Sequence, residues 1–354
     1  MNFTLPGRFL PVDKEHRPVC DDTFDVPEFT LRDVTRSTAE AGVGTEEHGM
    51  TKIALLLVPA MVIVLLLHAV AQATSPRLQL VMQTRTYVSG LGKDNSPCTA
   101  SMPCQTFQAA LNTTIPGGEI FVLDSANYGP VSINKAVTIA SEGAVGGVLA
   151  LSGAGITINA GPNDVVTLRG LAIDGNNSGS VGIQFNSGPS LSIQNSVIRN
   201  FTNSGINFTP NSKSTLLVSD TVVTNNKSNG VVVVSGSGAV NGALNRVVAS
   251  ANGVGIFVYG SNTNVIITDT NAGNNNYGVG ASSSAVMVRN STISNNAVGL
   301  AADQAAIIRV GQSTVTANAT AWQATNGAQV QSYRNNNVSG NTADGTATST
   351  VALQ

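Results

Sequence analysis

The chain has 354 residues, enough for two average domains or for one elongated repeat domain. Hydrophobic residues make up 42% and charged residues only 11%, with 36 glycines, a composition that disfavours helical bundles and favours short strands joined by turns. The net charge is −2, and beyond residue 73 twelve basic residues face ten acidic ones, an excess too small to indicate a nucleic-acid partner.

The first 49 residues are mixed in charge and rich in Asp, Glu, Thr and Pro, with no sustained apolar period. Such a segment cannot bury enough apolar surface to offset its conformational entropy. Two interpretations remain open. Residues 1–49 form a disordered extension, or they precede a true translation start at Met50.

A run of eighteen residues without carboxylate, Lys or Arg follows, Ile53–Val70. Lys52 precedes this run, and the small-residue pattern Ala71-Gln72-Ala73 follows it, so residues 50–73 are typical of a cleaved signal peptide. The alternative is an uncleaved membrane anchor, because eighteen residues can just span a bilayer. We therefore expect an exported protein that is periplasmic, cell-surface or secreted, with membrane contact only through residues 53–70 if they are retained.

Two cysteines remain beyond the leader, Cys98 and Cys104, with five residues between them. An even pair in an exported protein predicts a disulfide that closes a small loop. A lone pair without histidine does not resemble a zinc site.

The next segment predicts a cap. Residues Pro103–Thr114 place Phe107, Ala110 and Leu111 on one apolar face of a short helix, which we expect to end at Gly117-Gly118. Such a helix would cover the open end of the sheets that follow. We expect the first strands at four segments: Glu119–Asp124, Val131–Ala140, Ile156–Ile158 and Val165–Ile173.

Three columns then repeat along the chain. The first is a glycine followed by apolar residues, at steps of 21 to 25 residues: Gly182, Gly205, Gly230, Gly255, Gly278 and Gly299, with Ala321 last. The second is a polar residue at an expected tight turn: Asn195, Asp220, Asn245, Asp269, Asn290 and Gln312. The third is an apolar residue followed by asparagine, as in Val223-Thr224-Asn225-Asn226, Ile293-Ser294-Asn295-Asn296 and Val315-Thr316-Ala317-Asn318.

Each period therefore holds three strand-sized segments separated by polar turns. A leucine-rich repeat would need a leucine framework, and a propeller blade would need about forty residues. A right-handed parallel β-helix fits, with each period forming one coil and β-branched residues filling the interior. In this fold we expect the second column to form a structural amide ladder, because Asn and Asp tolerate left-handed backbone and stacked amides can hydrogen-bond along the axis.

The segment that begins at Arg85 resembles the first coils of the pectin-lyase-like superfamily. It shares the F-x-x-A-L helix at Phe107–Leu111, the Pro-Gly-Gly at 116–118, the Tyr-Gly before V-x-I at 128–133 and the K-x-V-T-I strand at 135–139. The resemblance covers residues 84–341 and implies an all-β fold, a single-stranded right-handed parallel β-helix with a short N-terminal capping helix. Residues 342–354 are then a C-terminal tail. The superfamily contains lyases, hydrolases, esterases and adhesins, so the resemblance leaves activity open.

The three histidines, His16, His48 and His68, all precede the expected mature domain, which removes histidine-based catalysis from it. No two acidic residues after residue 73 lie within four positions of each other, so a carboxylate pair must come from stacked coils. One pair is Asp220 and Asp269, two coils apart at about 9–10 Å, flanked by Arg246 and Arg289. Inverting glycosidases separate their carboxylates by about 6.5–9.5 Å. We favour the alternative interpretation, in which Asp220 and Asp269 are two members of the structural ladder and do not take part in catalysis.

From these features we expect an exported protein that binds extended glycan, or another envelope surface, without catalysis and without a metal or cofactor. One alternative is a polysaccharide lyase or glycoside hydrolase acting on a uronate-type glycan. A second alternative is a structural or adhesin-like module. Four aromatic residues could stack on sugar rings: Tyr259, Tyr277, Trp322 and Tyr333.

Overall fold

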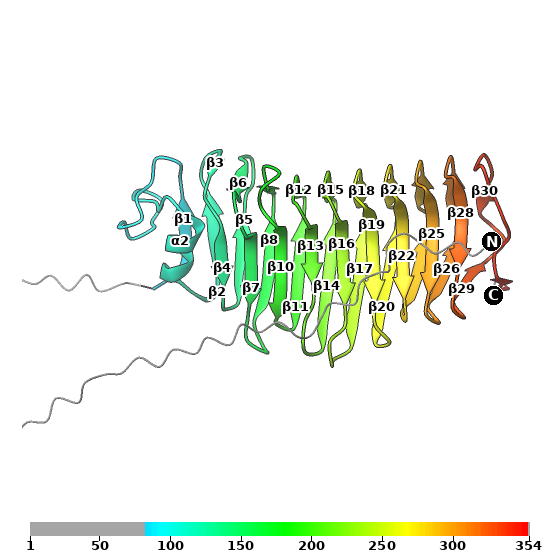
Figure 1. The fold of residues 1–354 in the computed structure, drawn as a ribbon. Coiled ribbons are helices and arrows are strands. Elements are labelled where there is room, and N and C mark those ends of the chain that lie inside the picture. The colour runs from blue at the N-terminus through cyan, green and yellow to red at the C-terminus, as the bar shows by residue number, and fades with distance from the viewer. Residues whose placement is uncertain (1–81, 353–354) are drawn as a thin grey trace, which may run out of the picture. The chain divides into compact units, whose positions relative to one another are not determined.

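The computed structural model describes residues 82–352, which wind into a right-handed parallel β-helix of three parallel sheets and one helix (Figure 1). Each coil contributes one strand to each sheet, and each strand pairs in parallel with its counterparts in the coils before and after it. The predicted fold class is confirmed. The expected extension at residues 1–49 and the apolar run at residues 53–70 lie outside the described residues. Within residues 82–352 no helix is long and apolar enough to cross a membrane.

Sheet A is the longest of the three and contains twelve strands. Its outer surface carries the candidate site described below. Its members, in order, are β1 (Gln83–Val88), β2 (Thr114–Val122), β5 (Val137–Ala140), β8 (Val165–Arg169), β11 (Ser190–Gln194), β14 (Ser214–Ser219), β17 (Val240–Asn245), β20 (Thr263–Thr268), β23 (Ala285–Arg289), β26 (Ile307–Gly311), β29 (Gln329–Ser332) and β31 (Ser349–Thr350).

Sheet B follows sheet A, after a turn of one or two residues in the coils from β8 to β27, and its ten strands have two to four residues each. They are β3 (Ala126–Asn127), β6 (Gly146–Leu149), β9 (Leu171–Asp174), β12 (Val197–Arg199), β15 (Val222–Thr224), β18 (Val248–Ser250), β21 (Asn271–Gly273), β24 (Thr292–Ser294), β27 (Thr314–Thr316) and β30 (Asn337–Val338).

Sheet C completes each coil with nine strands. They are β4 (Val131–Ile133), β7 (Ala154–Asn159), β10 (Val181–Ser187), β13 (Ser204–Phe208), β16 (Asn229–Val234), β19 (Val254–Tyr259), β22 (Tyr277–Ser282), β25 (Val298–Asp303) and β28 (Thr320–Ala324).

Two of the expected first strands are divided in the structure. Val131–Ala140 becomes β4 and β5, and Val165–Ile173 becomes β8 and β9. Gly170 separates the second pair with a φ of 73°, so the chain turns there from sheet A into sheet B. A continuous apolar run in the sequence therefore passes around a corner of the coil.

The cap forms where the sequence predicts it. Helix α2 (Phe107–Thr113) begins at Thr106, whose side chain accepts a hydrogen bond from the Ala109 N–H at 3.2 Å. Phe107, Ala110 and Leu111 are buried against the first coil. The helix ends before the expected Gly117-Gly118, because Thr114 turns into β2 while its hydroxyl binds the Ala110 carbonyl at 2.7 Å. Cys98 and Cys104 lie at bonding distance beside this cap, with their Cα atoms 4.6 Å apart.

The glycine column marks the closest approach between coils. A Cβ at Gly255 would lie 2.6 Å from the Gly278 carbonyl oxygen, and a Cβ at Gly278 would lie 2.6 Å from that of Gly299. Only glycine allows successive coils to stack this tightly at the start of sheet C. Between these positions the interior is dry and filled by β-branched and aromatic side chains, including the stacked rings of Phe185 and Phe208, whose centroids are 4.4 Å apart.

The buried amide ladder lies in the turn between sheets B and C, formed by the asparagines of the third column. Its members are Asn226, Asn252, Asn275, Asn296, Asn318 and Asn341. Each side-chain oxygen accepts the backbone N–H of the preceding member at 2.9–3.0 Å. The position before each ladder member adopts left-handed backbone, for example Asn225 at φ 57° and Ala251 at φ 55°. The turn thus fixes the amide toward the interior, where its hydrogen bonds are shielded from water.

Candidate functional site

A row of exposed polar residues follows the turn between sheets A and B. Its members adopt left-handed backbone with φ between 47° and 63°: Asn195, Asp220, Arg246, Asp269, Asn290, Gln312 and Arg334. One predicted member is wrong, because Asn245 ends strand β17, where it pairs with Ser219 and Thr268, and Arg246 takes the turn position. The repeat spacing in the sequence placed Asn245 at the turn because the coil that contains β17 holds one more residue before its turn than the preceding coil.

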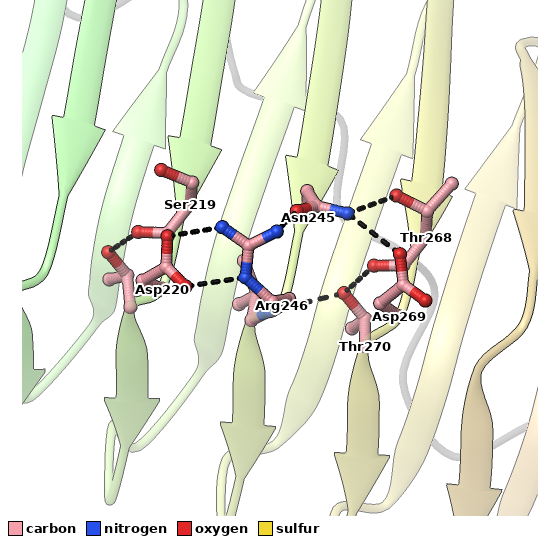
Figure 2. Close-up of polar contacts among 9 residues, drawn as sticks. Ser219, Asp220, Asn245, Arg246, Thr268, Asp269 and Thr270 are labelled. Atoms are coloured by element: carbon pink, nitrogen blue, oxygen red, sulfur yellow. Dashed lines mark hydrogen bonds and ion pairs between the residues drawn. The ribbon is translucent and has the colours of Figure 1, made fainter.

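Asp220 and Asp269 lie two coils apart in this row and are joined by a polar network (Figure 2). Arg246 donates to both oxygens of Asp220, at 2.6 Å and 2.7 Å. Its remaining Nη donates to the Asn245 side-chain oxygen, and the Asn245 amide donates to Asp269 at 2.9 Å. The Asn290 amide donates to the other oxygen of Asp269. The row is therefore a network of charges and amides in which neighbouring coils are tied together, and it differs from the simple amide ladder that we expected.

This geometry disfavours a glycosidase pair. The hydrogen bond and charge of Arg246 lower the pKa of Asp220 below its ordinary value, and Asp220 in turn raises the pKa of Arg246. A general acid needs the opposite shift, a raised pKa that keeps its proton near neutral pH. The guanidinium and the Asn245 amide also occupy the space between the two carboxylates, where the sugar bond would have to lie.

The arginines of the described chain divide into two groups. Four of them form ion pairs with a carboxylate of the adjacent coil or strand: Arg85 with Glu119, Arg169 with Glu142, Arg199 with Asp174 and Arg246 with Asp220. Arg289, Arg309 and Arg334 lie in the last coils, and within residues 82–352 no carboxylate lies in ion-pair distance of them. Uncompensated positive charge therefore gathers at the C-terminal end of sheet A.

A pocket opens at this end. Its volume is about 440 Å³, within the range of small-molecule sites. We call it the Arg289 pocket, and its lining residues are Met287, Arg289, Gly311, Gln312, Tyr333, Asn335, Val351 and Ala352. Arg289 donates through Nε to the Gln312 side-chain oxygen at 2.8 Å, and the backbone N–H of Gln312 donates to the Asn335 side-chain oxygen at 3.0 Å. These bonds orient the polar wall of the pocket.

The C-terminal segment contributes the opposite wall. Strand β31 pairs with β29 through Gln331 and Ser332, and the Val351 N–H continues this pairing to the Ser332 carbonyl at 2.9 Å. Residues 342–354 were expected to be a tail, but within the described part of this segment Ser349–Thr350 add a strand to sheet A. Val351 and Ala352 give the pocket an apolar surface facing its cation and amides.

Of the four aromatic residues that we considered for sugar stacking, only Tyr333 lines the pocket. Tyr259 and Tyr277 belong to sheet C. Trp322 is half-buried and packs against the end of the core, with its indole N–H enclosed and without a hydrogen-bond partner. Arg289 was considered above as a neighbour of the two aspartates and Tyr333 as a residue for sugar stacking. Stacking of the coils brings both residues to one cavity.

A second cavity of about 470 Å³ lies over the turn between sheets B and C, where Lys227 and several asparagines line it. Its floor includes Asn226 and Asn252, whose side-chain groups are already bound within the amide ladder. These floor groups have no hydrogen-bonding capacity directed at a ligand. The Arg289 pocket, whose arginine has no carboxylate partner within residues 82–352 and which also contains Tyr333, is therefore the stronger candidate site.

No protein-family model matches the sequence, and no curated protein matches it. Two solved structures share its fold. The A-module of the mannuronan C-5 epimerase AlgE6 from Azotobacter vinelandii aligns at 18% identity with a TM-score of 0.47, covering 69% of this chain and 92% of that chain. The A-module of AlgE4 from the same organism aligns at 15% identity with a TM-score of 0.44, covering 67% and 91%.

These comparisons correct one expectation. We expected a protein that binds glycan without catalysis, but both of these structures are named as mannuronan C-5 epimerases, and the non-catalytic interpretation is not retained. The three parallel sheets make the chain a parallel β-helix protein.

Proposed function

We propose that the protein is an enzyme that modifies a uronate-type polysaccharide, with one sugar unit held in the Arg289 pocket. The observation that carries this proposal is Arg289, which has no carboxylate partner in the described chain and lines a pocket together with Tyr333. Arg309 and Arg334, which also have no carboxylate partner there, add positive charge in the same last coils. The likeness to the two epimerase modules is one of fold, and the proposal rests on the pocket.

The lining of the pocket suits a sugar acid. Arg289 uses Nε to hold Gln312, which leaves its Nη groups to bind a carboxylate. Asn335 and Gln312 offer amide groups to ring hydroxyls, and Met287 and Val351 offer apolar surface to the C–H face of the ring. A neutral sugar would leave the arginine without a partner, so an anionic unit is favoured.

The same groups support proton abstraction beside the carboxylate. A cation on the carboxylate of a uronate stabilises the negative charge that develops when the C5 proton leaves. Tyr333 contributes the phenol of the lining, and as a phenolate it is the candidate acceptor of this proton. The resulting carbanion either expels the C4 substituent, giving an unsaturated sugar, or takes back a proton at C5.

We further propose that the protein works outside the cytoplasm, after export through residues 50–73. The Cys98–Cys104 pair supports this placement, because such pairs persist as disulfides in oxidising compartments. N-terminal sequencing of the native protein tests it: a first residue near Thr74 is expected, and a mature chain that contains Cys20 would contradict cleavage.

The function is tested by incubating the protein with polymannuronate, polyguluronate, polygalacturonate and polyglucuronate in D₂O. We expect deuterium at C5 by NMR, or ultraviolet absorbance from unsaturated ends, with at least one of these polymers. Arg289→Ala and Tyr333→Phe should each lower kcat/KM by roughly 100-fold or more. Arg199→Ala, an exposed arginine of sheet B, is the matched control and should retain activity.

Three results would contradict the proposal. No change in any acidic polymer would remove the enzymatic function. Reducing ends released without unsaturation or C5 exchange would indicate hydrolysis. Equal loss of activity in Arg199→Ala would show that the effect is not specific to the pocket.

A further inference from the structure

We infer that Gly311 is the specificity-determining residue of the Arg289 pocket, because its missing side chain leaves room for the Tyr333 ring and the Asn335 side chain that shape the space for the sugar unit. This inference rests on the proposed function and adds to it the residue that decides whether a sugar ring can enter.

Gly311 stands out in its column. The outward-facing residues at the ends of the sheet A strands pair in the order Ser219, Asn245, Thr268, Arg289 and Gly311, and the first four carry polar side chains. Gly311 has no side chain, and it lies between Arg289 on the preceding coil and Tyr333 on the next coil. The pocket lies at this gap.

The backbone does not require glycine at this position. Gly311 is not among the residues with positive φ, and β26 pairs with β23 without a register shift. The atoms nearest to a Cβ built there belong to side chains, the Tyr333 ring at 3.2 Å and the Asn335 side-chain oxygen at 3.4 Å. No backbone atom blocks the position, in contrast to the coil-stacking glycines of sheet C.

Where no bulge or bend explains a glycine in a strand, it often marks close approach of a ligand. Gly311, the last residue of β26, has no positive φ and no register shift. Here it also lets the Tyr333 ring lie over the strand. A side chain at position 311 would project between Arg289 and Tyr333 and push the phenol outward. Loss of ligand binding is therefore expected to follow side-chain volume at this position.

The chain offers a matched control in Gly280. This glycine lies in the interior of β22 on sheet C, without positive φ, and its Cβ would meet the Phe257 ring at 3.2 Å. Gly280→Ala therefore imposes the same kind of contact with an aromatic ring, far from the pocket. It separates the effect of crowding a ring from the effect of closing the site.

The experiment measures binding of uronate trisaccharides by calorimetry, together with turnover, for the wild type, Gly311→Ala, Gly311→Thr and Gly280→Ala. We expect about tenfold weaker binding for Gly311→Ala, no measurable binding for Gly311→Thr, and wild-type binding for Gly280→Ala. Circular dichroism and thermal unfolding of each variant show that the β-helix is intact.

The outcomes separate this inference from the proposed function. Wild-type binding by Gly311→Thr would overturn the inference while leaving the function in place. Binding by the wild type that Gly311→Thr abolishes, without turnover of any acidic polymer, would refute the enzymatic function and support Gly311 as the residue that shapes the pocket. Failure of the wild type to bind any of the trisaccharides would overturn both.

Discussion

Replacement of Asn275 by alanine should strongly destabilise the amide ladder. The Asn275 amide donates to the Ala249 carbonyl at 3.0 Å and to the Asn296 side-chain oxygen at 3.2 Å. Its own oxygen accepts from the Asn252 backbone at 2.9 Å and from the Asn252 side chain at 3.4 Å. Four hydrogen bonds, each worth about 1 kcal/mol net, are lost in a site only 5% exposed. We expect a loss of about 4 kcal/mol in the free energy of unfolding.

The neighbouring residue provides the control. Asn274 adopts left-handed backbone at φ 58° on the exposed side of the same turn, and alanine occupies the equivalent position in other coils at Ala251 and Ala317. Asn274→Ala should therefore cost only about 1 kcal/mol, from the poorer fit of alanine to this backbone.

The assay is urea unfolding followed by circular dichroism, with amide hydrogen exchange of residues 249–253 and 272–297 to detect local opening. Exchange is needed because repeat proteins can unfold in parts, which makes a single unfolding free energy incomplete. In Asn275→Ala we expect early exchange at the Asn252 amide, which has lost its acceptor. Equal midpoints and equal exchange in the two variants would refute the view that the buried ladder stabilises the coils.

Three further predictions concern the rest of the β-helix. The pKa of Asp220 is lowered in the folded state by Arg246, so any stability from this exposed pair is present above the ordinary Asp value of 3.8 and is lost as pH falls through the lower folded pKa. Urea midpoints of the wild type and Arg246→Ala should therefore converge in acid, and an unchanged difference there would contradict the ion pair. Reduction of Cys98–Cys104 should lower the free energy of unfolding by about 2 kcal/mol in the wild type, while the double Cys→Ser variant should not respond to reductant. Gly278→Ala should separate two coils and lower the thermal midpoint, since its Cβ would lie 2.6 Å from the Gly299 carbonyl oxygen. Gly280→Ala should lower the midpoint much less. Similar midpoints of the two variants would argue against coil stacking as the reason for the glycine column.

Much of the fold could be predicted from the sequence because its determinants recur locally in every coil. Gly255 and its counterparts mark the closest contact between coils, and β-branched side chains alternate into the interior. Both the glycines and the β-branched residues therefore repeat in the sequence with the period of the coil. The capping helix was also predictable, since Phe107, Ala110 and Leu111 show the helical spacing of an apolar face.

The candidate site was predictable only in part. Arg289 and Tyr333 were named for separate reasons, and Gln312 only as a member of the expected ladder. The pairing of Arg246 with Asp220, which disfavours a glycosidase pair, depends on side-chain directions that spacing does not give. One signal was present in the sequence: Gly311 is a glycine in a column whose preceding members, from Arg169 to Arg289, are polar.

The architecture could be inferred from the amino-acid pattern alone, as a β-helix whose glycine column repeats every 21 to 25 residues, with a helical cap and a cysteine pair, because repeated local patterns specify repeated local structure. Which asparagines form the buried ladder and which arginines lack an ion-pair partner in the described chain depends on how the coils stack. The coil length varies from one turn to the next, so a one-residue difference exchanges Asn245 with Arg246 at the corner. Side chains about 22 residues apart meet in the Arg289 pocket only when that register is fixed by stacking.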